Sequence, residues 1–170
     1  MIKLRSLTLE DAQITWKWRN LPDVRNDFSG QPFHVSIEHE QQWIKTVIGS
    51  NLPNSVFGVE LLQSADLVGL TYLKNIHLVH RQAEFAILIS PEHSGKGVGK
   101  AACRETLKFG FHDLNLHRIY LKVRQDNAPA IRVYKSCGFT EEGILRDDVF
   151  KQGEFRNHIL MSVLEHEFKG

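Results

Sequence analysis

A glycine-rich loop holds the residues whose types and spacing are most suited to chemistry. It reads "HSGKGVGK" and contributes Ser94, Gly95, Lys96, Gly97, Val98, Gly99 and Lys100. Glycine tolerates positive φ and close backbone approach, so successive N–H groups can point at one anion, and a following helix adds the positive end of its dipole. The loop therefore predicts a phosphate site, with its two lysines adding charge at the rim.

Two common nucleotide-binding loops do not match this spacing. A Walker loop needs G-x-x-x-x-G-K-[ST], but the interval from Gly95 to Gly99 is one residue too short, and Ala101 replaces the magnesium-binding Ser or Thr. A dinucleotide fingerprint fails because the third glycine comes one residue early. A glycine-rich turn between a strand and a helix, without any ligand, is the purely structural alternative.

The elements that must position this loop follow from the periodicity of the apolar residues. Alternation predicts strands over residues 2–8, 55–62, 67–76, 83–89, 117–123, 138–151 and 154–168, with a turn at Gln152-Gly153. Helical spacing predicts helices over residues 8–20, 36–49, 101–114 and 129–138. Thr8 is the expected N-cap of the first helix. The apolar face of the second helix is expected to consist of Ile37, Trp43, Ile44, Val47 and Ile48.

The order of these elements indicates the fold class. A run of strands is followed by alternating strands and helices. This order predicts an α/β (α+β) fold, with a mixed, mostly antiparallel central sheet and helices on its faces. The 170 residues are enough for one domain with a full core, so we expect a single domain over residues 1–170.

The bulk composition excludes several classes of partner. Lys+Arg (21) and Asp+Glu (20) nearly cancel, so no electrostatic attraction to nucleic acid or to an anionic membrane is expected. No apolar run is long enough for a transmembrane helix, and the N-terminus lacks the apolar region of a signal peptide. A cytoplasmic protein is therefore expected.

The cysteines and histidines give no disulfide or metal pattern. Cys103 and Cys137 are too few for a disulfide framework, and the sequence has no CxxC or His/Cys cluster with zinc-like spacing. His77 and His80 have the spacing of a ligand pair, but they fall in an expected turn with no third ligand nearby. We therefore expect no metal.

A second motif follows the loop, in the stretch "VRQDNAPAIRVYKSCGF" at residues 123–139. Together the two segments resemble the GCN5-related N-acetyltransferase (GNAT) superfamily, whose acetyl-CoA signature [QR]-x-x-G-x-[GA] precedes a block N-x-x-A-x-x-x-Y-x-x-x-G-F. The block is matched in full by Asn127, Ala130, Tyr134, Gly138 and Phe139. In the signature both glycines match, but Ser94 stands where Gln or Arg is usual, which removes one side-chain contact. Residues 80–102 and 143–168 are similar to the branch of ribosomal-protein, polyamine and amino-sugar acetyltransferases.

The resemblance implies acetyl transfer from acetyl-CoA to a primary amine by direct attack. It implies that the diphosphate of CoA lies on the amides of residues 95–99. It also implies that the preceding strand splays from its neighbour, so that Ile87, Leu88 and Ile89 bind the pantetheine arm. An N–H near Leu88 is the expected donor to the oxyanion. Asn127 and Ala130 are further expected cofactor contacts, although a helix N-cap is the alternative role for Asn127.

Tyr134, which the resemblance indicates, and Glu84, which is suggested by its place on a central strand, are the candidate catalytic residues. Tyr134 is the candidate general acid that protonates the leaving thiolate, and a tyrosine packed in the core is the alternative. Glu84 alternates with Phe85 on a central strand and is the candidate base, directly or through water; a salt-bridged carboxylate is the alternative. Cys137 as a nucleophile has no neighbouring histidine in the sequence, and a small buried cysteine is the commoner case.

For the acceptor, a nucleotide-linked amino sugar is the first expectation. Arg19, Arg25 and the nearby tryptophans resemble those of acetyltransferases that act on such sugars, with the arginines binding a diphosphate and the tryptophans stacking on a base or sugar. Helix-surface arginines and core tryptophans are the structural alternative.

A polyamine is the second candidate acceptor, and it needs carboxylates. Residues 29–33, "SGQPF", have none where spermidine acetyltransferases carry a glutamate pair, although Glu38 and Glu40 remain available. A protein N-terminus, as in ribosomal-protein acetyltransferases, and a non-catalytic acyl-CoA sensor are further alternatives. The C-terminal strand is an expected free edge, through which two copies would form a homodimer.

Overall fold

The structure of the chain is a computed structural model that describes residues 1–27, 33–49 and 55–170. Its strands form one sheet in the order β1-β2-β3-β4-β5-β7-β6. They are β1 (Ile2–Arg5), β2 (Ser55–Leu61), β3 (Leu67–His77), β4 (Gln82–Ile89), β5 (Arg118–Arg124), β6 (Thr140–Lys151) and β7 (Glu154–Leu164). Every neighbouring pair is antiparallel except β4 and β5, which confirms the mixed, mostly antiparallel sheet.

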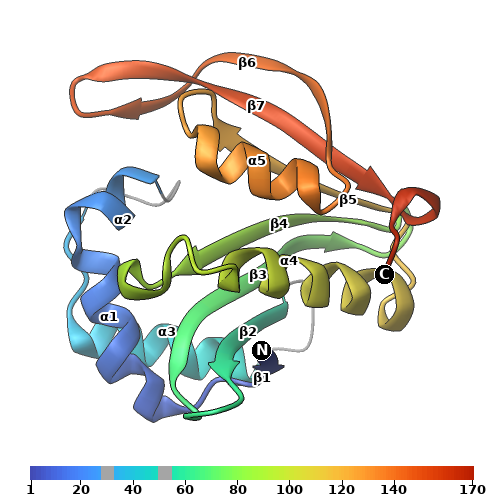
Figure 1. Cartoon of the computed structure of the whole chain (residues 1–170). Helices are drawn as coiled ribbons and strands as arrows, with labels where there is room; N and C mark the ends of the chain where they lie inside the picture. The colour runs from blue at the N-terminus through green and yellow to red at the C-terminus, as the bar shows by residue number, and fades with distance from the viewer. Residues whose placement is uncertain (28–32, 50–54) are drawn as a thin grey trace.

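Helices cover both faces of this sheet (Figure 1). They are α1 (Ala12–Asn20), α2 (Pro22–Asp27), α3 (Ile37–Gly49), α4 (Val98–Lys108) and α5 (Ala128–Ser136). The α3 face of the sheet, with Leu70 and Tyr72, packs on α1 and α3. The α5 face, with Leu73 and Phe85, packs on α4 and α5. Since successive strand residues point to opposite faces, each strand side chain belongs to one face or the other.

Local signals set the ends of several elements as predicted. The backbone N–H of Thr8 donates to Asp11 Oδ2 at 2.8 Å, in a short 3₁₀ turn before α1. The turn at Gln152-Gly153 has positive φ at both residues, 53° and 84°, as a type I′ hairpin turn requires. Ile48 departs from the predicted apolar face of α3, because its side chain is 52% exposed.

Two features of the topology differ from the prediction. Helix α2 was not expected, because a six-residue segment is too short to show a helical period. The C-terminal strand β7 is not a free edge, since it lies between β6 and β5 and pairs with β5 along seven positions. The outer strand is β6, so the edge expected to support a homodimer was assigned to the wrong strand.

The sheet opens between β4 and β5. These strands pair in parallel at three positions only, with Glu84 opposite Tyr120 as the last pair. Beyond it, β4 continues to Ile89 and β5 to Arg124 with no further pairing between these described segments. The predicted splay is therefore present, and it begins at Glu84 and Tyr120.

Candidate active site

The glycine-rich loop follows β4 and leads into α4. Gly95 (φ 74°) and Gly97 (φ 81°) have the left-handed backbone that glycine adopts without strain, and Gly97 is the N-cap of α4. The N–H groups of Val98, Gly99 and Lys100 belong to the first turn, where an α-helix supplies no partner. These amides and the helix dipole together make the N-terminus of α4 suitable for binding an anion.

The rest of the loop fits the same role. Ser94 and both loop lysines are exposed, so their side chains can reach the rim of the anion site. The N–H of Ser94 donates to the oxygen of Pro91 at 3.2 Å, and it is therefore not available to a ligand. A Cβ on Gly99 would lie 3.6 Å from Cγ1 of Ile89, which shows that the start of α4 sits directly against the splayed strand.

The register of β4 decides which of its backbone groups face the gap. The N–H of Ser90 donates to the oxygen of Val68 on β3 at 2.9 Å. Polar groups alternate sides along an antiparallel strand, so Leu88 also directs its N–H toward β3, whereas Ile87 and Ile89 direct theirs into the gap. Ile87 and Ile89 therefore suit the predicted contact with the pantetheine arm. The N–H of Leu88 itself does not point into the gap, so an oxyanion donor on this strand would have to be the N–H of a neighbouring residue.

Tyr134 lies on α5, beside the start of the gap. Its ring centroid is 6.2 Å from that of Phe85, the first β4 residue beyond the paired segment, and 5.8 Å from that of Phe139. The side chain is partly buried against the core of the α5 face. Tyr134 can therefore pack against the core and still lie beside the gap between β4 and β5, so its two predicted roles do not exclude each other.

Asn127 caps α5, which was the alternative role expected for it. Its Oδ1 accepts the backbone N–H of Ala130 at 3.2 Å. Its own N–H donates to the oxygen of Arg124 at 3.0 Å, which fixes the start of α5 against the end of β5. The side-chain amide nitrogen bonds none of the described residues, so it can still contact a cofactor.

Glu84 lies on the α3 face at the last paired position of β4. Its carboxylate is 3.5 Å from Lys74 Nζ and 3.3 Å from Asn75 Nδ2. Burial raises the pKa of the Tyr120 phenol, and the charge of Glu84 raises it further. Because Tyr134 belongs to the α5 face, a group held in the gap has Glu84 on one side of the sheet and Tyr134 on the other.

Arg19, which was predicted to bind a substrate diphosphate, pairs with a buried carboxylate in this structure. Its Nε lies 3.3 Å from Oε2 of the fully buried Glu40, and its guanidinium stacks on the Trp43 ring at 4.2 Å. Glu40 also accepts a hydrogen bond from the Thr15 hydroxyl at 2.6 Å. These contacts join α1 to α3, and they make Glu40 unavailable to a polyamine.

A known family matches most of the chain. The profile of the acetyltransferase (GNAT) domain covers residues 2–140. The chain belongs to the GNAT acetyltransferases. As a GNAT enzyme it is an N-acetyltransferase that uses acetyl-CoA as its co-substrate, which confirms the predicted enzyme class and co-substrate.

Relatives of this GNAT enzyme cover nearly its whole length. The spermidine N(1)-acetyltransferase of Escherichia coli (strain K12) is 34% identical over 167 residues, which are 98% of this chain and 88% of the relative. A putative ribosomal N-acetyltransferase of Bacillus subtilis, YdaF, is 34% identical over 99% of this chain and 87% of its own. The crystal structure of spermidine N-acetyltransferase from Vibrio cholerae in complex with CoA and spermine has a TM-score of 0.91 and 33% identity, covering 98% of this chain and 96% of that one.

The remaining acceptor predictions for the GNAT enzyme concern α2 and α3. Residues 29–32 of the acid-free stretch lie outside the described part of the chain. Nη1 of Arg25 lies 3.3 Å from Nε2 of His34. The backbone oxygen of Arg25 accepts a hydrogen bond from Lys151 Nζ at 2.9 Å. The second contact ties α2 to β6. Glu38 is exposed on α3.

The two cysteines of the GNAT enzyme lie between α4 and α5. Cys103 is fully buried, and Cys137 Sγ lies 3.8 Å from the backbone oxygen of Lys100. The hydrogen bond with Cys103 lowers the pKa of Cys137 to about 7, whereas burial raises the pKa of Cys103. Because Cys137 is itself buried, its position agrees with the structural role and not with that of a nucleophile.

No metal site is found in the described part of the GNAT enzyme. The rings of His77 and His80 stack at 4.1 Å, and no group of three or more His, Cys, Asp or Glu residues is arranged to hold an ion within residues 1–27, 33–49 and 55–170. Among the helices in those ranges, none is long and apolar enough to span a membrane.

Asp148, His158 and Lys122 form a polar cluster on the α3 face that simple alternation does not predict. Asp148 Oδ2 lies 2.7 Å from His158 Nδ1 and 3.2 Å from Lys122 Nζ. The only signal for it in the sequence is Arg146-Asp147-Asp148, a run of charged residues that interrupts an alternating strand.

Proposed function

We propose that this GNAT enzyme acetylates a primary amine of a polyamine such as spermidine, with residues 1–170 acting as one domain. The observation that carries the proposal is the likeness, over nearly the whole chain, to spermidine acetyltransferases of two bacteria. The nucleotide-linked amino sugar has weaker support, because Arg19, one of the two arginines expected to bind its diphosphate, is paired with the buried Glu40.

The charges of the α3 face support a cationic acceptor. This face carries the carboxylates Glu84, Glu142 and Asp148, which pair with Lys74, Arg118 and Lys122 respectively. Ion pairs that reach solvent contribute little to stability, so a substrate ammonium can replace a lysine at low cost. The face therefore offers several anionic positions to a substrate that carries several positive charges.

The proposed reaction takes place in the gap between β4 and β5. The diphosphate of acetyl-CoA binds at the amides of residues 95–99 and its pantetheine arm runs along Ile87 and Ile89, which places the thioester near Phe85. The amine approaches from the α3 face, where Glu84 takes its proton directly or through water. The nitrogen then attacks the thioester carbonyl, and a β4 amide that faces the gap stabilises the oxyanion. Collapse of this species breaks the carbon–sulfur bond, and Tyr134 protonates the thiolate from the α5 face. The second proton of the substrate nitrogen leaves to water, and water restores the proton of the Tyr134 hydroxyl.

A thiol-release assay with a panel of amines tests the proposed acceptor. We expect CoA release with spermidine and spermine, and at least tenfold lower kcat/KM with nucleotide-linked amino sugars and with peptides that begin like ribosomal proteins. A preference for either of those acceptors contradicts the proposal. If CoA binds tightly but no amine causes its release, the chain is an acyl-CoA sensor and not a working enzyme.

The pH profile tests Glu84 as the base. An alkylammonium has a pKa of about 10, so little free amine exists at neutral pH. Glu84→Gln is expected to lower kcat/KM for spermidine at least tenfold at pH 7, and the deficit should narrow toward pH 9.5 as free amine accumulates. Glu154→Gln, at the exposed end of the β6–β7 hairpin, is the control. An unchanged pH profile in Glu84→Gln would exclude the base role.

A further inference from the structure

Strand β6 is interrupted where it passes His158. Its register against β7 shifts between Leu145 and Val149, so residues 146–148 stand opposite Asn157 alone. Asp147 has a φ of 52°, and its N–H donates to Asn157 Oδ1 at 2.9 Å, which holds the extra residues in place. Such bulges bend a strand and turn a side chain to a new direction, and they are frequent next to active sites.

The bulge places Asp148 over the α3 face. Its Oδ2 accepts a hydrogen bond from Nδ1 of His158, a side chain that is only 7% exposed. This hydrogen bond is the main reason that the pKa of Asp148 is lowered, so the carboxylate is charged at neutral pH. The other oxygen, Oδ1, has Lys122 Nζ at 3.4 Å as its only partner in the described part of the chain.

Lys122 already places an alkylammonium group against the Asp148 carboxylate. Its Nζ is a primary ammonium on a flexible chain, which is the group that ends a polyamine. The lysine side chain is 40% exposed, so it can turn into solvent with little loss of free energy. The Asp148 carboxylate is less free to move, because the ring of the buried His158 is hydrogen-bonded to it.

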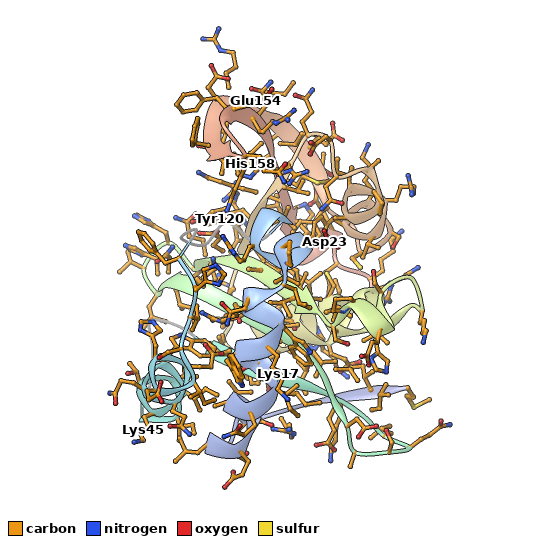
Figure 2. All side chains as sticks on the ribbon, turned by 90° about the vertical axis from the view of Figure 1, so that its left-hand side faces the viewer. Lys17, Asp23, Lys45, Tyr120, Glu154 and His158 are labelled. Atoms are coloured by element: carbon orange, nitrogen blue, oxygen red, sulfur yellow. The ribbon has the colours of Figure 1, made fainter. Side chains whose placement is uncertain are left out.

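The spacing between this carboxylate and the gap suits a polyamine. Tyr120 stands opposite Glu84, and Arg124 stands opposite His158, so the two sites are separated by four residues of β5, about 13 Å at about 3.3 Å per residue. Lys122 lies between Tyr120 and Arg124 on β5, and its ammonium contacts Asp148 on the side that faces the gap. Figure 2 shows Tyr120 and His158 in this order toward the end of the hairpin marked by Glu154.

We propose that Asp148, aimed by the β6 bulge and held by His158, binds a second ammonium of the polyamine acceptor while the reacting amine lies at Glu84. Lys122 competes with the substrate for this carboxylate. The inference rests on the proposed polyamine activity and adds a residue that selects long, multiply charged amines over simple ones. An amine with a single ammonium cannot occupy both positions, so only polyamines gain from Asp148.

Steady-state kinetics with spermidine and butylamine, at saturating acetyl-CoA, test this role. Asp148→Asn keeps the shape but removes the charge, and it should raise the KM for spermidine about tenfold, as expected for the loss of a charge-assisted hydrogen bond. The KM for butylamine should stay within twofold. Lys122→Gln removes the competing ammonium and should lower the KM for spermidine about threefold. The matched control is Glu141→Gln, which removes an exposed β6 carboxylate that pairs with Lys135.

The two variants are expected to act in opposite directions, which a general structural defect does not produce. If Asp148→Asn does not fold, the direction of the Lys122→Gln effect decides. A spermidine KM that is unchanged or raised in Lys122→Gln, or equal changes for spermidine and butylamine in Asp148→Asn, would overturn the inference. A wild-type enzyme that acetylates butylamine but no polyamine contradicts the proposed function itself. This outcome can be distinguished from a failure of the Asp148 inference, which appears only in the variants.

Discussion

Tyr134→Phe is expected to lower kcat about 100-fold while the affinity for acetyl-CoA stays within twofold, since general acid catalysis typically contributes at least that much. The ring packs against Phe85 and Phe139, at 6.2 and 5.8 Å between centroids, and phenylalanine keeps both contacts. Only the hydroxyl is removed, so the loss falls on protonation of the thiolate and not on binding. Thiol-release kinetics give kcat, and isothermal titration gives the affinity.

Ser136→Ala is the matched control for this experiment. Ser136 lies on the same helix, is exposed, and donates its hydroxyl to the oxygen of Val133 at 2.7 Å. Its replacement should change neither kcat nor affinity by more than about twofold. A kcat for Tyr134→Phe that equals that of the wild type would remove the phenol from the mechanism. A loss of acetyl-CoA binding would show instead that its hydroxyl holds the cofactor.

Glu40→Ala is expected to lower the free energy of unfolding by about 3 kcal/mol or more, the cost typical of removing one partner from a buried ion pair. Glu40 is 0% exposed and neutralises Arg19, whose guanidinium lies against the Trp43 ring. Without it, the arginine charge and the Thr15 hydroxyl lose their partner inside the contact between α1 and α3. Urea unfolding measures the change as a shift of the midpoint at constant slope.

Glu38→Ala provides the comparison on the same helix. Glu38 is exposed, so its replacement should change the free energy of unfolding by no more than about 0.5 kcal/mol. The double variant Arg19→Met/Glu40→Met replaces both charges by apolar groups and should recover much of the lost stability. Equal stability of Glu40→Ala and Glu38→Ala would contradict the assignment of Glu40 to the core. Arg19 would then be a candidate for binding the acceptor.

The cofactor side of the molecule could be predicted from the sequence because its signals are local. Gly95 and Gly97 need positive φ, and Asn127 has the spacing of an N-cap, so neighbouring residues decide these conformations. The same holds for the hairpin turn after β6. The splay between β4 and β5 is not a local signal, and the sequence indicated it only through the resemblance to a family.

The acceptor side was harder to predict because distant segments build it. Glu40 looked available to a substrate, yet the fold brings it to Thr15, 25 residues earlier in the chain, and buries it. Alternation alone cannot place Asp148, because the bulge shifts the residues after it by two positions relative to β7. Local patterns therefore predict the conformation of the candidate cofactor site, whereas tertiary contacts determine which charged residues near the candidate acceptor site are buried and which are exposed.

A crystal structure of the protein with CoA and spermidine tests most directly the claim that donor and acceptor meet across the gap between β4 and β5. We expect the diphosphate on the amides around Gly97, the sulfur within hydrogen-bonding reach of the Tyr134 hydroxyl, and the amine on the opposite face beside Glu84. A diphosphate away from the start of α4, or both substrates on the same face of the sheet, would contradict this claim.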